Sequence, residues 1–323
     1  MNIDLKDRKI LYHLDTNCRQ SNTYIGKHVG LKKDVVSYRI NNLLKNEIIS
    51  NFYTEINTFR LGYQVFRIYI NFQYVNPVKK KEIIDYFVNY KNSWVVGTVK
   101  SEIDFCAVIW VKDIYEFYQF WNKTLDKYEE FFSKYYISIY IQATTYRKSY
   151  LLYDKEVAKD HMLFRIQCGG KSVEIDKLDY SLLNELADNA RTPLVDLAEK
   201  LQTTSQTISN RIKYLLKNDV IKTFRVNLNL KNIGLQQFKV DIYLREHKYK
   251  KPIFKYLSTN PSLQFMNFSI GWSDLGPEFV VSHYDDLYRI LDEINLQFPN
   301  SIKKHSFFII DKIYKIRCLP VLF

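Results

Sequence analysis

The sequence has few cysteines and no long apolar run. The four cysteines (Cys18, Cys106, Cys168 and Cys318) are scattered and form no Cys-x-x-Cys pair. This spacing argues against a disulfide framework and a cysteine-based zinc site, and it fits a reducing cytosol. The longest apolar run covers only residues 105–111, whereas a membrane-spanning helix needs about 20 apolar residues, and the charged N-terminus lacks the apolar segment of a signal peptide. We therefore expect a cytoplasmic protein with no membrane contact.

Acidic side chains are outnumbered by basic ones. Lys and Arg total 47 against 35 Asp and Glu, a formal net charge of +12 at pH 7. This balance favours a polyanionic partner, nucleic acid first. Hydrophobic residues make up 46% and charged residues 25%, which is ordinary for a globular protein and excludes a disordered chain. The six histidines show no metal-ligand spacing and no evident Cys or Ser partner, so we predict no catalytic residue, no metal and no cofactor.

An internal repeat organises the chain. Shifted by 172 positions, residues 3–62 align with residues 175–234 without a gap, and Leu43-Leu44-Lys45-Asn46 returns as Leu215-Leu216-Lys217-Asn218. In the second copy, apolar spacing predicts helices over 176–187, 193–201 and 205–218, followed by short alternating strands that are typical of a wing. This order indicates a winged helix-turn-helix. The alternative is a three-helix packing module that touches no nucleic acid.

The rest of each unit alternates strand and helix in the order βαββαβ. We predict strands at 63–73, 93–101, 104–111 and 136–147 with helices at 77–90 and 113–132. In the second copy the strands are 236–245, 263–271, 277–283 and 302–317 and the helices 250–259 and 285–298. The order implies a four-stranded antiparallel sheet with both helices on one face.

The predicted fold class is therefore α+β, with two winged helix-turn-helix modules alternating with two ferredoxin-like domains. Their expected bounds are 1–62 and 175–234 for the helical modules and 63–150 and 235–323 for the ferredoxin-like domains. Residues 151–174 are expected to be a linker, in which Gly169 and Gly170 suggest a hinge.

At this point the sequence resembles the Lrp/AsnC, or feast/famine, family of transcription regulators. The second copy carries the family's motifs in order: Asp176 and Asp179, Asn189 and Arg191, Ser205, Ile208 and Arg211 in the recognition helix, and Gly234. The first copy matches less well. The resemblance implies a regulator that binds double-stranded DNA. It also implies a ferredoxin-like domain that pairs sheets between subunits and often binds an amino acid. The chain holds two copies where ordinary members have one.

The third helix of each module is expected to enter the major groove. Gln206 and Asn210 lie one turn apart, a spacing at which each can offer two hydrogen bonds to adenine. We expect lysines and arginines to reach phosphates, with a packing or salt-bridge role as the alternative for Arg39 and Arg211, and a helix-dipole role as the alternative for Asp34. The predicted DNA-binding residues are Lys33, Asp34, Tyr38, Arg39 and Asn41 in the first copy, and Ser205, Gln206, Asn210, Arg211 and Lys213 in the second.

The two recognition helices present different side chains, so we expect them to prefer different bases. A covalent pseudo-dimer of this kind would read an asymmetric site, whereas identical subunits read a palindrome. A homodimer of two chains is the alternative arrangement, because like copies can pair between chains.

The resemblance also points to an effector site. In the family, a Gly-x-x-Asp turn between the second and third strands lies near the effector pocket. The second copy keeps it as Gly271 and Asp274, whereas the first has Ser101-Glu102-Ile103-Asp104. We carry over Gly271 and Asp274 as effector-binding residues, and the alternative is that they only shape a tight turn.

Two other functions remain open at this stage. Siroheme decarboxylases resemble the same family, occur as fused two-unit chains, and carry histidines in the strand after the linker glycine. Here residues 63–68 and 235–240 contain no histidine, which argues against that enzyme. The third possibility is a protein-binding adaptor that uses the aromatic sheets.

Overall fold

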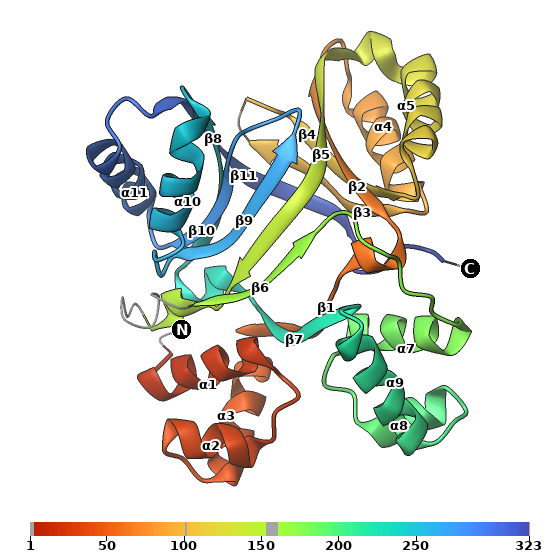
Figure 1. The fold of residues 1–323 in the computed structure, drawn as a ribbon, viewed down its shortest axis with the longest axis vertical. Coiled ribbons are helices and arrows are strands. Elements are labelled where there is room, and N and C mark those ends of the chain that lie inside the picture. Colours follow the sequence, from red (N-terminus) through yellow and green to blue (C-terminus); the bar gives the residue numbers. More distant parts are fainter. Residues whose placement is uncertain (1–2, 101, 153–160, 323) are drawn as a thin grey trace.

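The computed structural model describes residues 3–100, 102–152 and 161–322, and the described chain forms two similar units (Figure 1). Each unit begins with a module of three helices and one strand. In the first they are α1 (Leu5–Thr16), α2 (Asn22–Val29), α3 (Lys33–Lys45) and β1 (Ile49–Ile56). In the second they are α7 (Lys177–Asp188), α8 (Leu194–Lys200), α9 (Ser205–Lys217) and β7 (Ile221–Leu228). The predicted helices are confirmed to within a residue or two at each end.

Each unit continues with the predicted βαββαβ order, which the structure confirms. In the first unit the elements are β2 (Gln64–Phe72), α4 (Pro77–Asn89), β3 (Ser93–Lys100), β4 (Phe105–Val111), α5 (Ile114–Tyr128) and β5 (Phe132–Tyr146). In the second they are β8 (Gln236–Leu244), α10 (Lys250–Leu257), β9 (Leu263–Ile270), β10 (Gly276–Val281), α11 (Tyr284–Gln297) and β11 (Ile302–Ile316). The α+β fold class is therefore correct.

The two ferredoxin-like sheets are joined along both edges. Within the units the strand orders are β5-β2-β4-β3 and β11-β8-β10-β9, and the units meet where β3 pairs with β11 and β9 pairs with β5. The β2–β5 pairing closes the sheet into a ring. Because each free edge strand is paired with the other unit, neither sheet leaves an open edge at these junctions.

Strands β5 and β11 hold the two units together. Each has 15 residues, about twice the length of its neighbours. The first half of β5 pairs with β2 of its own unit, and residues 139–145 pair with β9 of the other. Strand β11 does the same, with residues 302–308 on β8 and 309–316 on β3. Every long strand therefore belongs to both units.

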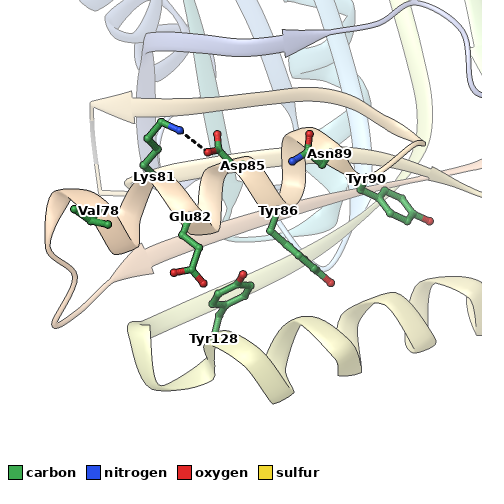
Figure 2. A pocket seen from close by; sticks show the side chains of 8 residues that line it. All are labelled: Val78, Lys81, Glu82, Asp85, Tyr86, Asn89, Tyr90 and Tyr128. Atoms are coloured by element: carbon green, nitrogen blue, oxygen red, sulfur yellow. Dashed lines mark hydrogen bonds and ion pairs between the residues drawn. The ribbon is translucent and has the colours of Figure 1, made fainter.

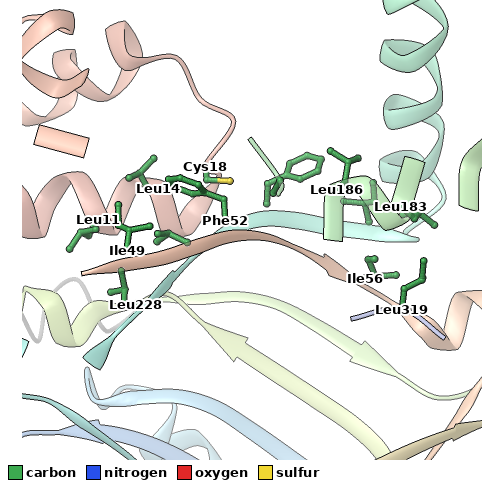
Figure 3. Packing of buried hydrophobic residues seen from close by; sticks show 14 of the residues in the cluster. Leu11, Leu14, Cys18, Ile49, Phe52, Ile56, Leu183, Leu186, Leu228 and Leu319 are labelled. Atoms are coloured by element: carbon green, nitrogen blue, oxygen red, sulfur yellow. The ribbon is translucent and has the colours of Figure 1, made fainter. Parts of the chain in front are cut away.

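The strands expected to form wings pair differently from the prediction. Each module supplies one strand, and β1 and β7 pair antiparallel with each other to make a two-stranded sheet. The expectation of a wing built within each module is wrong at this point, because a single strand must find its partner in the other copy. Buried residues of α1 and α7, such as Leu14 and Leu186, pack with Phe52 and Leu228 of this shared sheet (Figure 3).

The predicted linker also contains regular structure. Residues Met162–Gln167 form strand β6, which pairs with the second half of β5. Gly169 and Gly170 have φ angles of 86° and 84°, values that favour glycine. Residues 153–160 of this segment lie outside the described residues. Across the described chain, no helix is both long and apolar enough to span a membrane.

Candidate nucleic-acid interface

The turn before each recognition helix is tight. In the first module, a Cβ on Gly26 would lie 2.4 Å from the carbonyl oxygen of Leu31, and Gly30 has a φ of 72°. In this module a side chain at Gly26 would clash with the backbone of Leu31, and one at Gly30 would strain its own backbone. In the second module Ala198 and Gln202 occupy the equivalent places, and Gln202 keeps the positive φ, at 51°. Gln202 therefore carries the backbone strain that glycine avoids at position 30.

The Asp-x-x-Asp motif anchors the recognition helix. Asp4 and Asp7 form a capping box at the start of α1, in which the backbone N–H of Asp7 donates to Asp4 at 2.8 Å. The guanidinium of Arg39, on α3, donates to both carboxylates at 2.8 Å. In the second module, Arg211 contacts Asp176 at 2.8 Å and Asp179 at 3.1 Å. The motif thus fixes the angle between the first and third helices.

Arg39 and Arg211 each form ion pairs within their own module. The hydrogen bonds that Arg39 donates to the carboxylates of Asp7 and Asp4 raise the pKa of its guanidinium. The backbone N–H of Asp179, together with Arg211, lowers the pKa of Asp176. In the structure, Arg39 and Arg211 therefore have the salt-bridge role that was the alternative to phosphate contact. Their contact with phosphate stays a prediction.

The remaining predicted residues lie on the free face of each recognition helix. Tyr38 is 66% exposed, and the side-chain amide of Gln206 donates to the side-chain oxygen of Asn210 at 3.0 Å. This contact confirms only that the two amides share one face. The side chains that are exposed, or partly so for Ser205, are Lys33, Asp34, Tyr38, Asn41, Ser205, Gln206, Asn210 and Lys213.

The two modules hold each other through reciprocal contacts that our reading of the sequence missed. The guanidinium of Arg19 donates to the carbonyl oxygens of Ala190 and Thr192, at 2.7 and 2.9 Å. Arg191 reaches in the opposite direction to Asn22, at 3.3 Å. The signal was present, because Asn-x-Arg occurs at the same place in both copies.

The first module has an additional buried anchor. The carboxylate of Asp15 on α1 is completely buried and accepts two hydrogen bonds of 2.9 Å from Arg225 on β7. The backbone N–H of Lys148 donates to the same carboxylate at 3.0 Å. Burial would raise the pKa of Asp15, but Arg225 and Lys148 bring it below its ordinary value. Burial lowers the pKa of Lys148 itself to about 8.

The predicted effector residues hold a turn in place. Gly271 has a φ of 87°, and a Cβ there would lie 2.5 Å from the carbonyl oxygen of Ile137. The side chain of Asp274 accepts a hydrogen bond from the backbone N–H of Leu244 at 2.8 Å. The first unit repeats this contact between Asp104 and Phe72, at 2.9 Å. These contacts are those expected if the two residues shape a tight turn, which was the alternative to effector binding. Effector binding by Gly271 and Asp274 stays a prediction.

A separate surface pocket lies between α4 and α5 of the first unit (Figure 2). It measures about 690 Å³ and is lined by Tyr86 and Tyr128, among others. Lys81 and Asp85 on its rim form an ion pair of 2.6 Å. Among the described residues, no group of three or more His, Cys, Asp or Glu side chains is placed to hold a metal ion.

Comparison with known proteins identifies the helical modules. Residues 175–216 match the model of the AsnC-type helix-turn-helix domain, and residues 3–50 match that of a winged helix-turn-helix DNA-binding domain. The HTH-type transcriptional regulator Ptr1 of Methanocaldococcus jannaschii is 30% identical over 112 residues, which are 35% of this chain and 74% of Ptr1. LrpA of Bacillus subtilis, also an HTH-type transcriptional regulator, is 24% identical over 133 residues, 41% of this chain and 92% of LrpA.

A solved structure matches nearly the whole chain in fold. The siroheme decarboxylase NirDL superposes with a TM-score of 0.65 over 97% of this chain and 93% of its own, at 10% sequence identity. At that identity the likeness concerns the fold alone. The sequence relatives and the two helix-turn-helix matches, one in each unit, show that the chain belongs to the Lrp/AsnC family of transcription regulators, in a tandem two-unit form.

Proposed function

We propose that this protein is a sequence-specific DNA-binding transcription regulator that works as a covalent pseudo-dimer on an asymmetric operator. The observation that carries the proposal is the shared β1–β7 sheet, on which two modules with different recognition helices are fixed. A rigid spacing between two helices is what a two-part DNA site requires. The net charge of +12 supplies the attraction to the phosphate backbone.

The two helices offer different chemistry to the bases. Gln206 and Asn210 present adjacent amides, and a well-placed amide pair with adenine contributes about 1–3 kcal/mol of discrimination. Helix α3, the recognition helix of the first module, presents Tyr38 and Asn41 on the corresponding exposed face. Lys33 and Lys213 are exposed and suited to phosphate contact, which positions the protein without reading sequence.

Selection of binding sites from random duplexes by the full chain tests the proposal. We expect two unlike half-sites, one altered by Gln206→Ala and the other by Tyr38→Ala. Light scattering of the complex gives the number of chains bound. One chain on an asymmetric site supports the proposal, whereas a palindrome bound by two chains would show that like copies pair between molecules and would overturn it.

The salt dependence of DNA affinity distinguishes residues that contact phosphates from residues that recognise bases. The logarithm of affinity falls with the logarithm of salt concentration by about 0.9 per phosphate contact. We expect Lys213→Ala and Lys33→Ala each to reduce this slope by about one contact while leaving the preferred sequence unchanged. Glu199→Gln, which changes an exposed charge on α8, serves as the control for a general charge effect.

Regulation by an amino acid is part of the same proposal, with Gly271 and Asp274 beside the effector. The decarboxylase alternative has its own test, because a bound tetrapyrrole absorbs strongly in the visible range. A purified chain that keeps such a chromophore and ignores DNA would replace the regulator by the enzyme. A chain that ignores DNA and retains a protein partner would favour the adaptor.

A further inference from the structure

Helices α4 and α10 have the same place in the two βαββαβ units but differ in charge. Each is the first helix of its unit and each contains three lysines. In α4, Lys79 forms an ion pair with Glu82 at 2.6 Å. Lys81 forms another with Asp85, also at 2.6 Å. Helix α10 contains no acidic residue. The charge of α4 is therefore largely balanced within the helix, whereas that of α10 is not.

Two lysines of α10 and an arginine of β6 form one exposed basic surface. Lys251 and Lys255 are four residues apart, so they share a face of the helix and lie about 6 Å apart along its axis. Arg165 is also exposed, and its guanidinium lies 5.9 Å from the centre of the Phe254 ring of α10. Within the described chain, none of these three cations has a carboxylate at ion-pair distance. Arg165, Lys251 and Lys255 together are the α10–β6 surface.

Acidic side chains beside α10 already have partners. Glu246, just before the helix, forms an ion pair with Lys248 at 2.8 Å. Glu293, on α11, accepts a hydrogen bond from the hydroxyl of Tyr256 at 3.1 Å. These two carboxylates are thus engaged elsewhere, and the charge of the α10–β6 surface is left for a partner outside the chain.

Although α10 belongs to the second unit, this surface lies beside the first helical module. The carbonyl oxygen of Ser258, at the end of α10, accepts a hydrogen bond from Nε2 of His161 at 2.9 Å. Nδ1 of the same ring lies 3.1 Å from the hydroxyl of Ser149. The preceding residue, Lys148, donates its backbone N–H to Asp15 of α1 at 3.0 Å. In the view of Figure 1, α10 accordingly lies on the side of the first module.

Helix α4 lies beside the second module in the same way. Lys315, near the end of β11, donates to the carbonyl oxygens of Val88 and Tyr90 at the end of α4, at 2.7 and 2.9 Å. Two residues later, Arg317 donates to the hydroxyl of Tyr180 on α7 at 3.3 Å. Each module therefore has a helix of the other unit beside it. Of these two helices, only α10 has exposed lysines that lack an acidic partner in the described chain.

Double-stranded DNA is the partner that this charge and position favour. Its phosphates place about one negative charge per 1.7 Å of duplex axis, which suits several cations on one surface. Positive charge also continues from this surface towards α1, where exposed Lys9 and the partly buried Arg147 lie near His13. Bending 20–30 base pairs of flanking DNA by 40–90° costs about 1–6 kcal/mol, and added phosphate contacts offset such a cost.

We propose that the α10–β6 surface binds the phosphates of the DNA that flanks the half-site of α3, and that the half-site of α9 has no matching contact beyond it. The inference rests on the DNA-binding function proposed above and deepens it, because it makes the contact with DNA longer on one side than on the other. Phosphate contacts carry no sequence information directly. The surface therefore adds affinity without lengthening the sequence that is recognised.

Hydroxyl-radical footprinting of the full chain tests the asymmetry. The probe is the duplex obtained by site selection, extended by about 30 base pairs at each end so that a bent flank fits on it. We expect protection to run further beyond the α3 half-site than beyond the α9 half-site, by about one helical turn, or about 10 base pairs. Tyr38→Ala identifies which half-site belongs to α3. Equal protection beyond the two half-sites would overturn the proposal.

A triple variant locates the contact. It combines Arg165→Gln, Lys251→Gln and Lys255→Gln, and it should lose the extra protection. We expect it to bind the extended duplex at least about tenfold more weakly, with the slope of log affinity against log salt reduced by about 2–3. On a duplex trimmed to the two half-sites it should bind as tightly as the unchanged chain. Unchanged affinity and slope on the extended duplex would overturn the proposal.

A control variant with the same change of charge is available on the helices of the first unit. Lys91→Gln, Lys123→Gln and Lys127→Gln together change three exposed lysines and should leave both affinities unchanged. Failure of operator recognition appears on the trimmed duplex, which does not reach the α10–β6 surface. Normal binding there with no gain from flanking DNA would remove this inference and leave the proposed function. Loss of binding to polyglutamate in the first triple variant, with DNA affinity unchanged, would assign the surface to an acidic protein and likewise overturn the proposal.

Discussion

The contact between the first and second helices differs in chemistry between the two helical modules, although it is made by the same pair of positions. In the first module, the rings of His13 and His28 lie with their centroids 5.2 Å apart. In the second, the equivalent residues are Glu185 and Lys200, which form an ion pair of 2.8 Å. One contact joins two bases that repel each other when protonated, and the other joins opposite charges. The copies have therefore kept the helix arrangement while changing what holds it.

The contrast extends to the shared sheet. Module one is anchored by the buried pair of Asp15 on α1 and Arg225 on β7, whereas the corresponding pair of positions for module two is Ala187 on α7 and Tyr53 on β1. Both modules also have a neutral contact with the sheet, because the hydroxyl of Thr54 donates to the carbonyl oxygen of Leu186 at 2.6 Å and that of Thr223 donates to the carbonyl oxygen of Thr16 at 2.7 Å. The buried ion pair is therefore the contact that distinguishes module one. A buried ion pair is costly to break because one partner is left as an unpaired charge. The first module should therefore be the more sensitive to single substitutions.

The largest effect is expected at Asp15. We expect Asp15→Ala to lower the free energy of unfolding by about 3–5 kcal/mol, because Arg225 and Lys148 lose their buried partner. Urea unfolding of the full chain measures the loss. Asp188→Ala, an exposed acid at the end of α7, is the control and should change stability by less than about 0.5 kcal/mol. An equal loss in the two variants would contradict a special role for the buried cluster.

A smaller effect is expected when the recognition helix loses its anchor. Arg211→Met should weaken DNA binding about tenfold, and Asp179→Asn should weaken it similarly, if the arginine acts by positioning α9. The salt slope of binding should then stay constant in both variants. A slope reduced by about one contact in Arg211→Met alone would show that Arg211 also touches phosphate. The pair Arg39→Met and Asp7→Asn repeats the comparison in the first module.

The histidine contact predicts a difference in pH response. Burial, with His28, Arg147 and Lys9 nearby, lowers the pKa of His13 below its ordinary value of 6.5. The folded state thus binds this proton less readily than the unfolded state. The stabilisation is present above pH 6.5 and is lost as pH falls below it.

Hydrogen exchange of α1 and α7 between pH 7.5 and 5.5 tests the difference. Protection of α1 should fall, while α7 should change less. The double variant His13→Glu with His28→Lys, which copies the second module, should remove the extra loss in α1. An identical pH response in that variant would assign the effect to other groups.

The smallest expected effect concerns the turn before α9. Gln202 has a φ of 51°, in the left-handed region, where a residue other than glycine costs roughly 1 kcal/mol. Gln202→Gly should raise the free energy of unfolding by about 0.5–1 kcal/mol, and Gly30→Gln should lower it by a similar amount. Thermal unfolding measures both. Loss of stability in Gln202→Gly would mean that its side chain makes a compensating contact.

Local pattern was enough to predict most of the elements. Apolar spacing and the repeat placed the helices and the βαββαβ strands within a few residues, because these depend on neighbours close in sequence. The pairing of β1 with β7 was not predictable in this way, since Phe52 and Val226 are brought together by the whole fold. Strand β6 was missed because it completes a sheet edge supplied by β5.

In the candidate interface, too, the features that depend on local spacing were predictable and those that depend on the whole fold were not. The exposed positions of α3 and α9 follow from helical spacing, and their contacts with DNA remain predictions. The pairing of Arg39 with Asp4 and Asp7 was only one of two alternatives, because sequence gives no distance between the ends of α1 and α3. The contacts of Arg19 and Arg191 with the opposite module depend on how the two copies are placed in space. The spacing of residues along the chain does not give that placement.

The covalent joining of the two units has a consequence for how such a protein evolves. In a homodimer, one mutation in the gene alters two places in the assembly, so a change that helps one copy of a hairpin is imposed on the other copy as well. Here Glu102 and Trp272, two residues before Asp104 and Asp274, occupy matching positions in the hairpins after β3 and β9 under separate codons. Each copy of the module, and each copy of the hairpin, is therefore open to selection on its own.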